Sequence, residues 1–420
     1  MIRIGYACLT EGVPGTELHA CTLRTATPEW LRQVTAHNLE ALRRQIAYNA
    51  ENGIRLFRIS SGLIPFGSGG GNTLDWEPEF TETFSEIGRT IARAGMRVSM
   101  HPGQYTVLNS PDLNVVENAV EDLAYHEKVL RLLHTDCSHK LILHTGGAYG
   151  DKKAAAERFC KNWRRLPDGV RSRVVLENDE RLYNIAEVLE LADRLGIPAV
   201  FDNLHHELNP PDQKASPAEW IGRCAQTWKA ADGRQKIHYS QQSSAGRSGA
   251  HSPTISPEPF LKFCEPVRQL DLDVMLEVKD KNRSAMKCIC LLSEGGSARL
   301  LEREWERYAY AVLERSPEIF ARIEQMLKSG AECSARRFYE LVEQAACIPA
   351  QTDSAAAAAA AIWSKLENDA DAAEKKRFLA CLGRYQNGDA GLQPVKNLLF
   401  RLAQKYRGAA VLESYYFLRR

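Results

Sequence analysis

The stretch Arg97-Val-Ser-Met-His-Pro-Gly-Gln-Tyr-Thr-Val-Leu-Asn-Ser110 joins a short apolar run to a turn with unusual side chains. The apolar run ends on His101, and the turn carries Gln104 and Tyr105, which are uncommon choices for a simple connector. A run of this length followed by turn residues is typical of a β-strand. The stretch therefore predicts a strand whose end carries chemically useful side chains.

Five more apolar runs downstream also end on a residue type that binds metal ions. They are Lys140–His144, Val174–Glu177, Ala199–Asp202, Gln235–His238 and Asp273–Glu277. A strand often ends on a polar residue because a loop follows, but this accounts for only one or two such endings. Six endings drawn from His, Asp and Glu indicate a common site.

Strand-like and helix-like segments alternate over the first 280 or so residues, as in a barrel of eight strands. We predict strands near 2–6, 54–60, 96–101, 140–144, 173–177, 198–202, 235–239 and 272–277. We predict helices near 28–52, 79–94, 112–134, 152–165, 182–195, 217–230 and 257–265. An open doubly wound sheet is the alternative, but eight similar repeats favour a closed (β/α)8 TIM barrel. Barrel enzymes carry their active sites at the carboxyl ends of the strands, where the polar endings fall here.

The character of the chain changes after Lys279. Helices are expected at 300–315, 318–328, 355–366, 372–384, 394–406 and 409–418. The segment 329–354 contains Gly, Cys, Ser and Pro and predicts a linker, and Thr352-Asp-Ser354 could cap the alanine-rich helix that follows. We therefore predict a TIM-barrel domain at 1–299 and an all-α accessory domain without chemistry of its own at 300–420.

Composition limits the classes of partner and compartment. The net charge of +1 means that a nucleic-acid partner needs a local basic patch rather than a globally basic surface. Eleven cysteines without a C-x-x-C motif favour a reducing cytoplasm over a disulfide framework. The chain shows no signal-type leader and no apolar run of 18 residues, so we expect a cytoplasmic protein without a membrane partner.

The strand endings and two loop histidines form a candidate metal-binding set. Side chains alternate along a strand, so Lys236 and His238 are expected to share the face that points into the barrel. The full set is His101, His144, Glu177, Asp202, His205, His238, His251 and Glu277. Nitrogen and carboxylate ligands without thiolate suit Mn, Zn or Fe(II). Eight ligands exceed the needs of one ion, so we expect two or three ions, with Glu177 as the best candidate for a bridge.

Clustered ions lower the pKa of a bound water and neutralise phosphate charge, which favours phosphodiester hydrolysis. Sugar isomerases use similar barrels and remain an alternative. Their sites contain fewer histidines and more carboxylates, so the histidine-rich set here favours a phosphate substrate. Lys236 is unusual in such a site: a depressed pKa or carbamylation would relieve repulsion from cations, or the lysine could reach phosphate or solvent. Gln104 and Tyr105 suit insertion into a base stack, although a loop that merely packs on its neighbour would also explain them.

At these residues the sequence resembles the UV damage endonuclease family, which is related to the abasic-site endonucleases of the endonuclease IV type. The resemblance covers residues 1–285 or so. It is carried by Gly5-Tyr6, Phe57–Ser61, His101–Tyr105, Leu108-Asn-Ser110, His144–Gly147, Leu176–Asp179, Phe201–His206, Lys236–Ser240 and Asp273–Lys279.

The resemblance implies a barrel nuclease that nicks damaged double-stranded DNA immediately 5′ of pyrimidine dimers and related lesions, and we expect the chain to be a monomer. The products would carry a 3′-hydroxyl and a 5′-phosphate, and manganese would be the most typical metal, with zinc an alternative. The implied substrate contacts are Gln104 and Tyr105, assisted by Tyr6 and Asn109. The implied catalytic residues are Glu177, Lys236, His238 and Glu277, with Lys236 matching a lysine that the family modifies.

Two positions depart from the family pattern. Gly69 stands about where the family usually carries a histidine, and no asparagine is evident in the first loop, where Thr10 is nearest. The region 374–417 weakly resembles a helical domain of unknown function. The alternatives to a UV damage endonuclease are an abasic-site endonuclease, a sugar isomerase or epimerase, and a catalytically impaired lesion-binding protein. The Gln104-Tyr105 pair argues against the abasic-site endonuclease. The excess of histidines argues against the isomerase, and the presence of all eight ligands argues against the impaired protein.

Overall fold

The computed structural model describes residues 1–293, 297–329 and 334–418. It confirms the predicted barrel, because eight parallel strands close in the order β1 to β8. The strands are β1 Arg3–Ala7, β2 Leu56–Ile59, β3 Arg97–Met100, β4 Leu141–His144, β5 Val174–Glu177, β6 Ala199–Asp202, β7 Gln235–Tyr239 and β8 Leu272–Leu276. Every residue of β3, β5, β6, β7 and β8 is buried. Such continuous burial is expected where helices cover one face of a parallel sheet and packed side chains cover the other.

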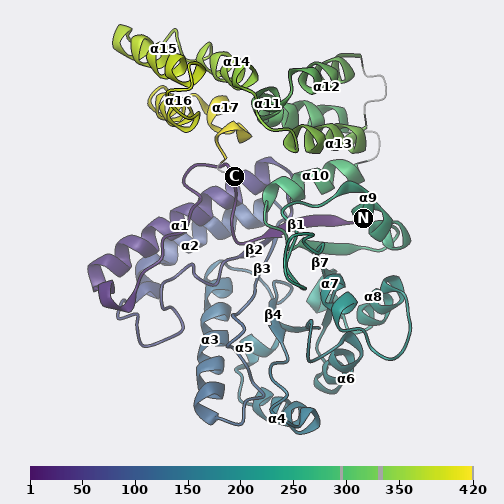
Figure 1. Ribbon diagram of the computed structural model, residues 1–420. Coiled ribbons are helices and arrows are strands. Elements are labelled where there is room, and N and C mark those ends of the chain that lie inside the picture. The colour runs from purple at the N-terminus through teal and green to yellow at the C-terminus, as the bar shows by residue number, and fades with distance from the viewer. Residues whose placement is uncertain (294–296, 330–333, 419–420) are drawn as a thin grey trace. The chain divides into compact units, whose positions relative to one another are not determined.

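Helices surround the strands (Figure 1). They are α1 Pro28–Glu51, α2 Trp76–Arg93, α3 Leu113–Leu132, α4 Lys152–Trp163, α5 Asp168–Arg171, α6 Ile185–Leu195, α7 Asn203–Leu208, α8 Pro217–Ala225, α9 Pro257–Cys264 and α10 Asn282–Leu292. Helix α1 begins as predicted, with the Thr27 hydroxyl accepting the Trp30 amide and Pro28 in the first turn. Helix α6 ends as predicted at Gly196, whose φ of 68° is left-handed. The sequence analysis missed α5 and α7, which are too short to show a period, and α10, whose polar and apolar residues are mixed.

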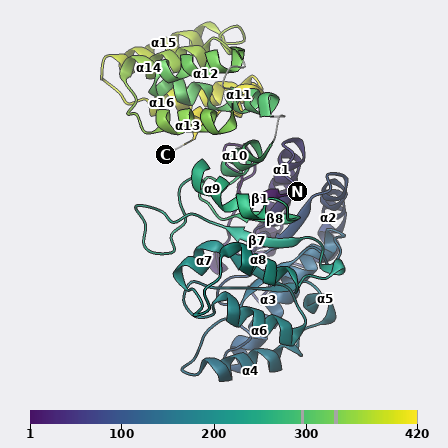
Figure 2. The same cartoon turned by 90° about the vertical axis from the view of Figure 1, so that its right-hand side faces the viewer.

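The C-terminal region is helical, which confirms the predicted fold class. Its helices are α11 Ser297–Arg315, α12 Pro317–Ser329, α13 Ala335–Ala346, α14 Thr352–Trp363, α15 Ala372–Gln386, α16 Gln393–Lys405 and α17 Ala409–Leu412. Helices α11 to α16 form one bundle (Figure 2). One apolar core lies among α11, α12 and α13, and a second lies among α14, α15 and α16.

The chain divides into two compact units. The barrel unit comprises Met1–Thr10 and Gly15–Met286, and the helical unit comprises Glu11–Pro14 and Lys287–Arg420. Within the described parts of both units, no helix combines the length and apolar character that a membrane crossing demands.

The predicted linker at 329–354 is wrong, because much of it is helix α13. Ser334 caps this helix by accepting the Arg337 amide, and Phe338, Leu341, Val342 and Ala345 are buried along it. The glycine, cysteine, serine and proline residues that suggested a linker lie around this helix rather than within it. Part of the predicted linker, 330–333, lies outside the described residues.

Two further details of the C-terminal prediction are also wrong. Gln351 rather than Thr352 or Ser354 is the N-cap of α14, and the Ser354 hydroxyl instead donates to the Glu314 carbonyl at 2.9 Å. The helix predicted at 409–418 is split into α17 and a 3₁₀ turn at Tyr415–Phe417. Tyr415 and Tyr416 are buried, so core packing sets the path of this segment in place of helix propensity.

Candidate metal centre

The ends of neighbouring barrel strands lie level with one another at the predicted site. His144 of β4 pairs in register with Glu177 of β5, and Asp202 of β6 pairs with His238 of β7. His101 directly follows β3 and Glu277 directly follows β8. Parallel pairing therefore brings these side chains to the same end of the barrel, which is the end that carries active sites in this fold.

Glu177 occupies the centre of the cluster and is 1% exposed. Its Oε1 accepts a hydrogen bond from His238 Nδ1 at 2.6 Å, and its Oε2 lies 3.1 Å from His101 Nε2. His144 Nε2 lies 3.6 Å from the same Oε2. Two groups of potential ligands share this carboxylate: His101, His144 and Glu177 form one, and Glu177, Asp202 and His238 form the other. Glu177 is therefore placed to bridge two ions.

The other predicted ligands lie around these two groups. His205 Nδ1 lies 3.7 Å from Asp202 Oδ1, and its hydrogen bond to the Asn178 carbonyl measures 2.9 Å. His251 Nε2 lies 3.6 Å from Glu277 Oε2, and Glu277 Oε1 lies 3.5 Å from His238 Nδ1. The structure therefore brings all eight predicted ligands into one continuous set of contacts.

The pKa values of Glu177 and His101 favour cation binding. Burial raises the pKa of Glu177, but the neighbouring His238 and His144 lower it by a larger amount. The net pKa of Glu177 therefore lies well below the usual value. Burial lowers the pKa of His101 to about 4, which leaves a neutral imidazole. Burial lowers the pKa of His205, but the carboxylates of Asp202 and Glu177 outweigh it and bring the pKa to about 9. His205 is therefore protonated at neutral pH, and a cation bound beside it would have to displace that proton.

Buried atoms without partners give an independent test of whether a cation fits. Asp202 is fully buried, and burial raises its pKa. Its Oδ2 has no hydrogen-bond partner among the described residues, and the same is true of His144 Nδ1 and His238 Nε2. A buried polar atom without a partner is costly, and an ion coordinated by such atoms removes that cost. The residues present fit a divalent cation.

Lys236 is fully buried inside the barrel, and its Nζ has no hydrogen-bond partner within the described part of the chain. Burial, and after it the charge of Arg97, lower the pKa of Lys236 well below its usual value. Asp273, the register partner of Lys236, is bonded instead to Arg3 at 2.7 Å and to Arg97 at 2.8 Å. Lys236 therefore lies beside guanidinium groups without a carboxylate of its own.

Sequence reasoning missed two residues that position the site. Arg58 of β2, whose side chain is 13% exposed, donates to Glu277 Oε1. Asn178 holds Asp202 in place, because its Oδ1 accepts the Asp202 amide at 2.9 Å and its Nδ2 donates to the Asp202 carbonyl at 3.1 Å. Both residues lie in motifs quoted above, but neither side chain is of a type that the search for metal ligands would select.

Gln104 and Tyr105 are exposed, and Tyr105 is 69% exposed. A Cβ on Gly103 would lie 2.4 Å from Tyr105 Cε1, so glycine is needed for the ring to lie where it does. The next residue, Thr106, anchors the turn by donating from its hydroxyl to Asp122 Oδ2 at 2.6 Å. A fixed turn with an exposed aromatic ring weighs against a loop that merely packs on its neighbour.

Tyr6 and Asn109 correct the sequence interpretation, because neither side chain reaches the surface. Tyr6 is fully buried, and its hydroxyl donates to Asn49 Oδ1 of α1 at 2.8 Å and shares a hydrogen bond with Thr10 at 2.7 Å. The β1 side chain thus faces the helix layer, where burial raises its pKa. Asn109 is also fully buried and donates from Nδ2 to the Gly147 carbonyl at 2.7 Å. In this structure both side chains are buried and hydrogen bonded within the protein.

The missing histidine leaves open space at position 69. A Cβ built on Gly69 would meet no heavy atom within 4 Å. A Cβ at this position would therefore meet no clash.

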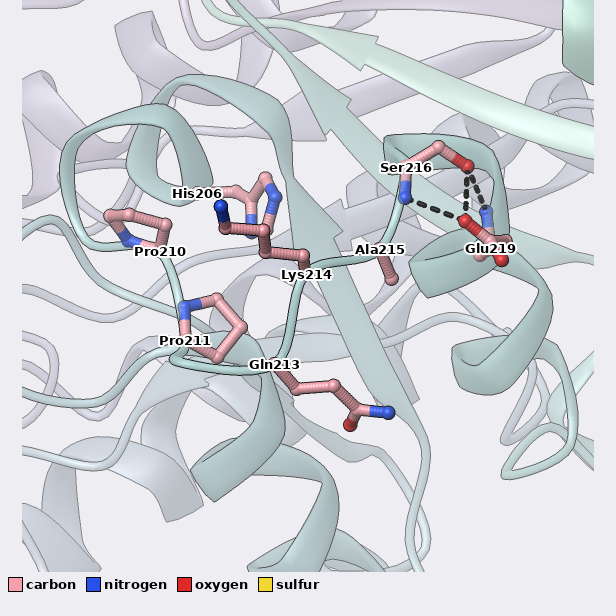
Figure 3. Close-up of a pocket in the computed structure, with 8 residues that line it drawn as sticks. All are labelled: His206, Pro210, Pro211, Gln213, Lys214, Ala215, Ser216 and Glu219. Carbon is pink, nitrogen blue, oxygen red and sulfur yellow. Dashed lines mark hydrogen bonds between the residues drawn. The ribbon is translucent and has the colours of Figure 1, made fainter.

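His206, the neighbour of His205, lies outside the cluster. Its ring centroid is 5.1 Å from that of Phe201 and 6.2 Å from that of Trp220. It borders a cavity of about 460 Å³ (Figure 3). The cavity is lined by His206, Pro210, Pro211, Gln213, Lys214, Ala215, Ser216 and Glu219. The Ser216 hydroxyl donates to Glu219 Oε2, and the residues that line this cavity include none of the eight predicted ligands.

Comparison with known proteins identifies the family. The model of the family described as UV-endonuclease UvdE matches residues 2–298, and that of a protein family of unknown function (DUF1722) matches residues 310–419. The UV DNA damage endonuclease of Clostridium perfringens is 38% identical over 331 residues, which cover 78% of this chain and 80% of the relative. The one from Bacillus velezensis is 33% identical over 303 residues, covering 70% and 94%. The crystal structure of SacUVDE has a TM-score of 0.65 and 33% identity, and the match covers 70% of this chain and 98% of that one. This chain belongs to the UV-endonuclease UvdE family.

Proposed function

We propose that this chain is a metal-dependent DNA repair endonuclease that cuts the duplex immediately 5′ to UV photoproducts. The cut would leave a 3′-hydroxyl and a 5′-phosphate. The observation that carries the proposal is the clustering of the seven other predicted ligands around Glu177 at the carboxyl end of the barrel. The chain shares 38% identity with a UV DNA damage endonuclease over most of both lengths, which supports the lesion specificity.

We propose that the eight predicted ligands hold two or three divalent ions and that these ions are Mn²⁺. When bound, such ions lower the pKa of a water molecule and neutralise charge on the attacked phosphate. Glu177 would be a ligand in both groups, and His101 would be a ligand as a neutral imidazole. Arg58 would fix the orientation of Glu277 and limit its negative charge. Asn178 would keep Asp202 and His205 aligned.

We propose that Lys236 reacts with carbon dioxide to form a carbamate, with release of a proton. The resemblance to the family suggests this modification, and the surroundings of Lys236 support it. Its Nζ is fully buried and has no described partner, while Arg97 and Arg58 lie close enough to affect its pKa. A carboxylate there would be stabilised by those guanidinium groups and would add an oxygen ligand near His238. Mass spectrometry of the native protein with and without bicarbonate tests for the added mass.

Gln104 and Tyr105 are proposed to probe the DNA at the lesion. Tyr105 offers an exposed aromatic face, and stacking of one base on such a face contributes about 1–3 kcal/mol. Flipping a base out costs least where damage has already weakened pairing, so an exposed probe can discriminate damaged from intact duplex.

The test is nicking, in manganese, of three matched duplexes that carry one cyclobutane dimer, one abasic site or no damage. We expect a cut 5′ to the dimer by the wild type, and loss of that cut in His238→Ala. Glu190→Gln, an exposed carboxylate on α6, is the matched control and should cut normally. Cleavage of the abasic duplex alone would favour an abasic-site endonuclease. Tight binding to damaged DNA without cleavage would favour the impaired lesion-binding protein that Gly69 raises as a second candidate.

We also propose a domain division and an oligomeric state. Residues 1–299 would form the nuclease domain, and residues 300–420 would form an accessory domain without chemistry of its own. The chain would act as a monomer, which light scattering after size-exclusion chromatography checks.

A further inference from the structure

The loop between β4 and α4, which begins directly after the predicted ligand His144, presents a second exposed aromatic side chain. Tyr149 is 46% exposed and lies five positions after His144. Its φ of +50° is left-handed, which is costly for a bulky residue, and the glycines Gly146 and Gly150 around it also have positive φ. An exposed aromatic ring on strained backbone adds little to the stability of the fold.

Arg158 of α4 supports the ring of Tyr149. The guanidinium carbon lies 5.5 Å from the ring centroid, a cation–π distance. The Nε of the same side chain donates to the Asn109 carbonyl at 2.9 Å. Arg158 therefore connects Tyr149 to the loop that carries Gln104 and Tyr105.

The two loops are also locked together by close packing. Asn109 Nδ2 donates to the Gly147 carbonyl at 2.7 Å. A Cβ on Gly146 would lie 2.5 Å from Asn109 Oδ1 and 3.0 Å from Val107 Cγ1, and one on Gly147 would lie 2.8 Å from the Tyr149 ring. Because Gly146 packs against Asn109 and Val107, and Asn109 bonds to Gly147, the backbone of the Tyr149 loop is held against the loop that follows the Gln104-Tyr105 turn.

We propose that Tyr149 is a second aromatic contact to damaged DNA, stacking on a nucleobase next to the lesion. This inference rests on the proposed function of the same site. A fixed, exposed ring loses little conformational entropy on binding, so its stacking energy is retained as affinity. Tyr105 and Tyr149 would then contact the duplex at two places while the phosphate lies over the predicted ligands.

The test compares binding of Tyr149→Ala, Tyr149→Phe and Tyr149→Trp to the dimer duplex by fluorescence anisotropy in metal-free buffer. The expected result is a Kd about 5- to 100-fold higher for the alanine variant, as loss of one stacked base predicts. The phenylalanine and tryptophan variants should stay near wild type because they keep the aromatic face. The control is Leu270→Ala, a similarly exposed apolar residue that precedes β8 at the other end of the barrel.

Two further measurements separate stacking from a structural role. Tyr149→Gly should be as stable as the wild type or more stable, because glycine accepts the left-handed backbone, yet it should bind the dimer duplex as weakly as the alanine variant. 2-Aminopurine next to the dimer should lose its wild-type fluorescence change in both variants. Wild-type affinity in Tyr149→Ala, or equal losses in Tyr149→Phe and Tyr149→Ala, would overturn the inference. Failure of the wild type itself to prefer or cut the dimer duplex would instead overturn the proposed function.

Discussion

Replacing Glu177 with glutamine should disable metal binding at both groups of ligands while leaving the barrel folded. The substitution keeps the volume of the side chain but removes the charge that His101, His144 and His238 surround. Because both groups share this residue, one change removes one of three ligands from each.

The expected magnitude follows from linkage. Loss of a residue that only orients a ligand already weakens metal binding by about 10- to 100-fold, so loss of the shared ligand should cost at least about 100-fold. At a metal concentration of 100 times the wild-type Kd, each filled position stabilises the fold by about 2.7 kcal/mol. At the same concentration the variant would gain only about 0.4 kcal/mol at each position. Metal-induced stabilisation should therefore fall by about 2.3 kcal/mol for each ion.

Urea unfolding with and without manganese, together with metal analysis of the purified protein, measures this difference. Without metal, Glu177→Gln should be less stable than the wild type near neutral pH, because the histidines around Glu177 hold its pKa below the usual value and so favour the carboxylate in the folded state. Glu190→Gln, on the exposed face of α6, should behave like the wild type in every assay. The reasoning is refuted if Glu177→Gln gains as much stability from manganese as the wild type, or if it cuts damaged DNA at the wild-type rate.

Position 69 offers a gain-of-function test: Gly69→His should leave nicking unchanged or raise it, because a Cβ at 69 meets no heavy atom within 4 Å. A clear loss of nicking would show that the glycine loop has a function of its own. Away from the site, His139 should make the fold sensitive to acid, because burial lowers its pKa to about 4 and its Nδ1 accepts the Val98 amide at 3.0 Å. The unfolded state, with a histidine pKa near 6.5, binds more protons between about pH 6.5 and 4. Up to about 3 kcal/mol of stability, present in full above pH 6.5, should therefore be lost as the pH falls through this window. Urea unfolding of the wild type and of His139→Gln at pH 7 and pH 4.5 measures the effect, and an equal loss in both proteins would contradict it.

The sequence by itself determined the barrel and the identity of the clustered side chains. Strand and helix periods are local, so eight apolar runs separated by helical patterns predict the closed fold without knowledge of any contact. The endings of these runs needed only one further rule, that parallel strands bring their carboxyl ends to one side. This is why Glu177 could be singled out as a bridge from its middle position among the strands.

The tertiary structure decided which side chains are available and what surrounds them. Tyr6 looks like a DNA contact in the sequence, yet the face of β1 that packs on α1 buries it against Asn49. Arg58 donates to Glu277, which lies 219 positions away in the chain. Helix α13 is stabilised by the burial of its apolar side chains. Such pairings depend on the geometry of closure and on which face of an element is covered. A local pattern of residues does not show how the barrel closes or which face is covered, because these contacts form between residues far apart in the chain.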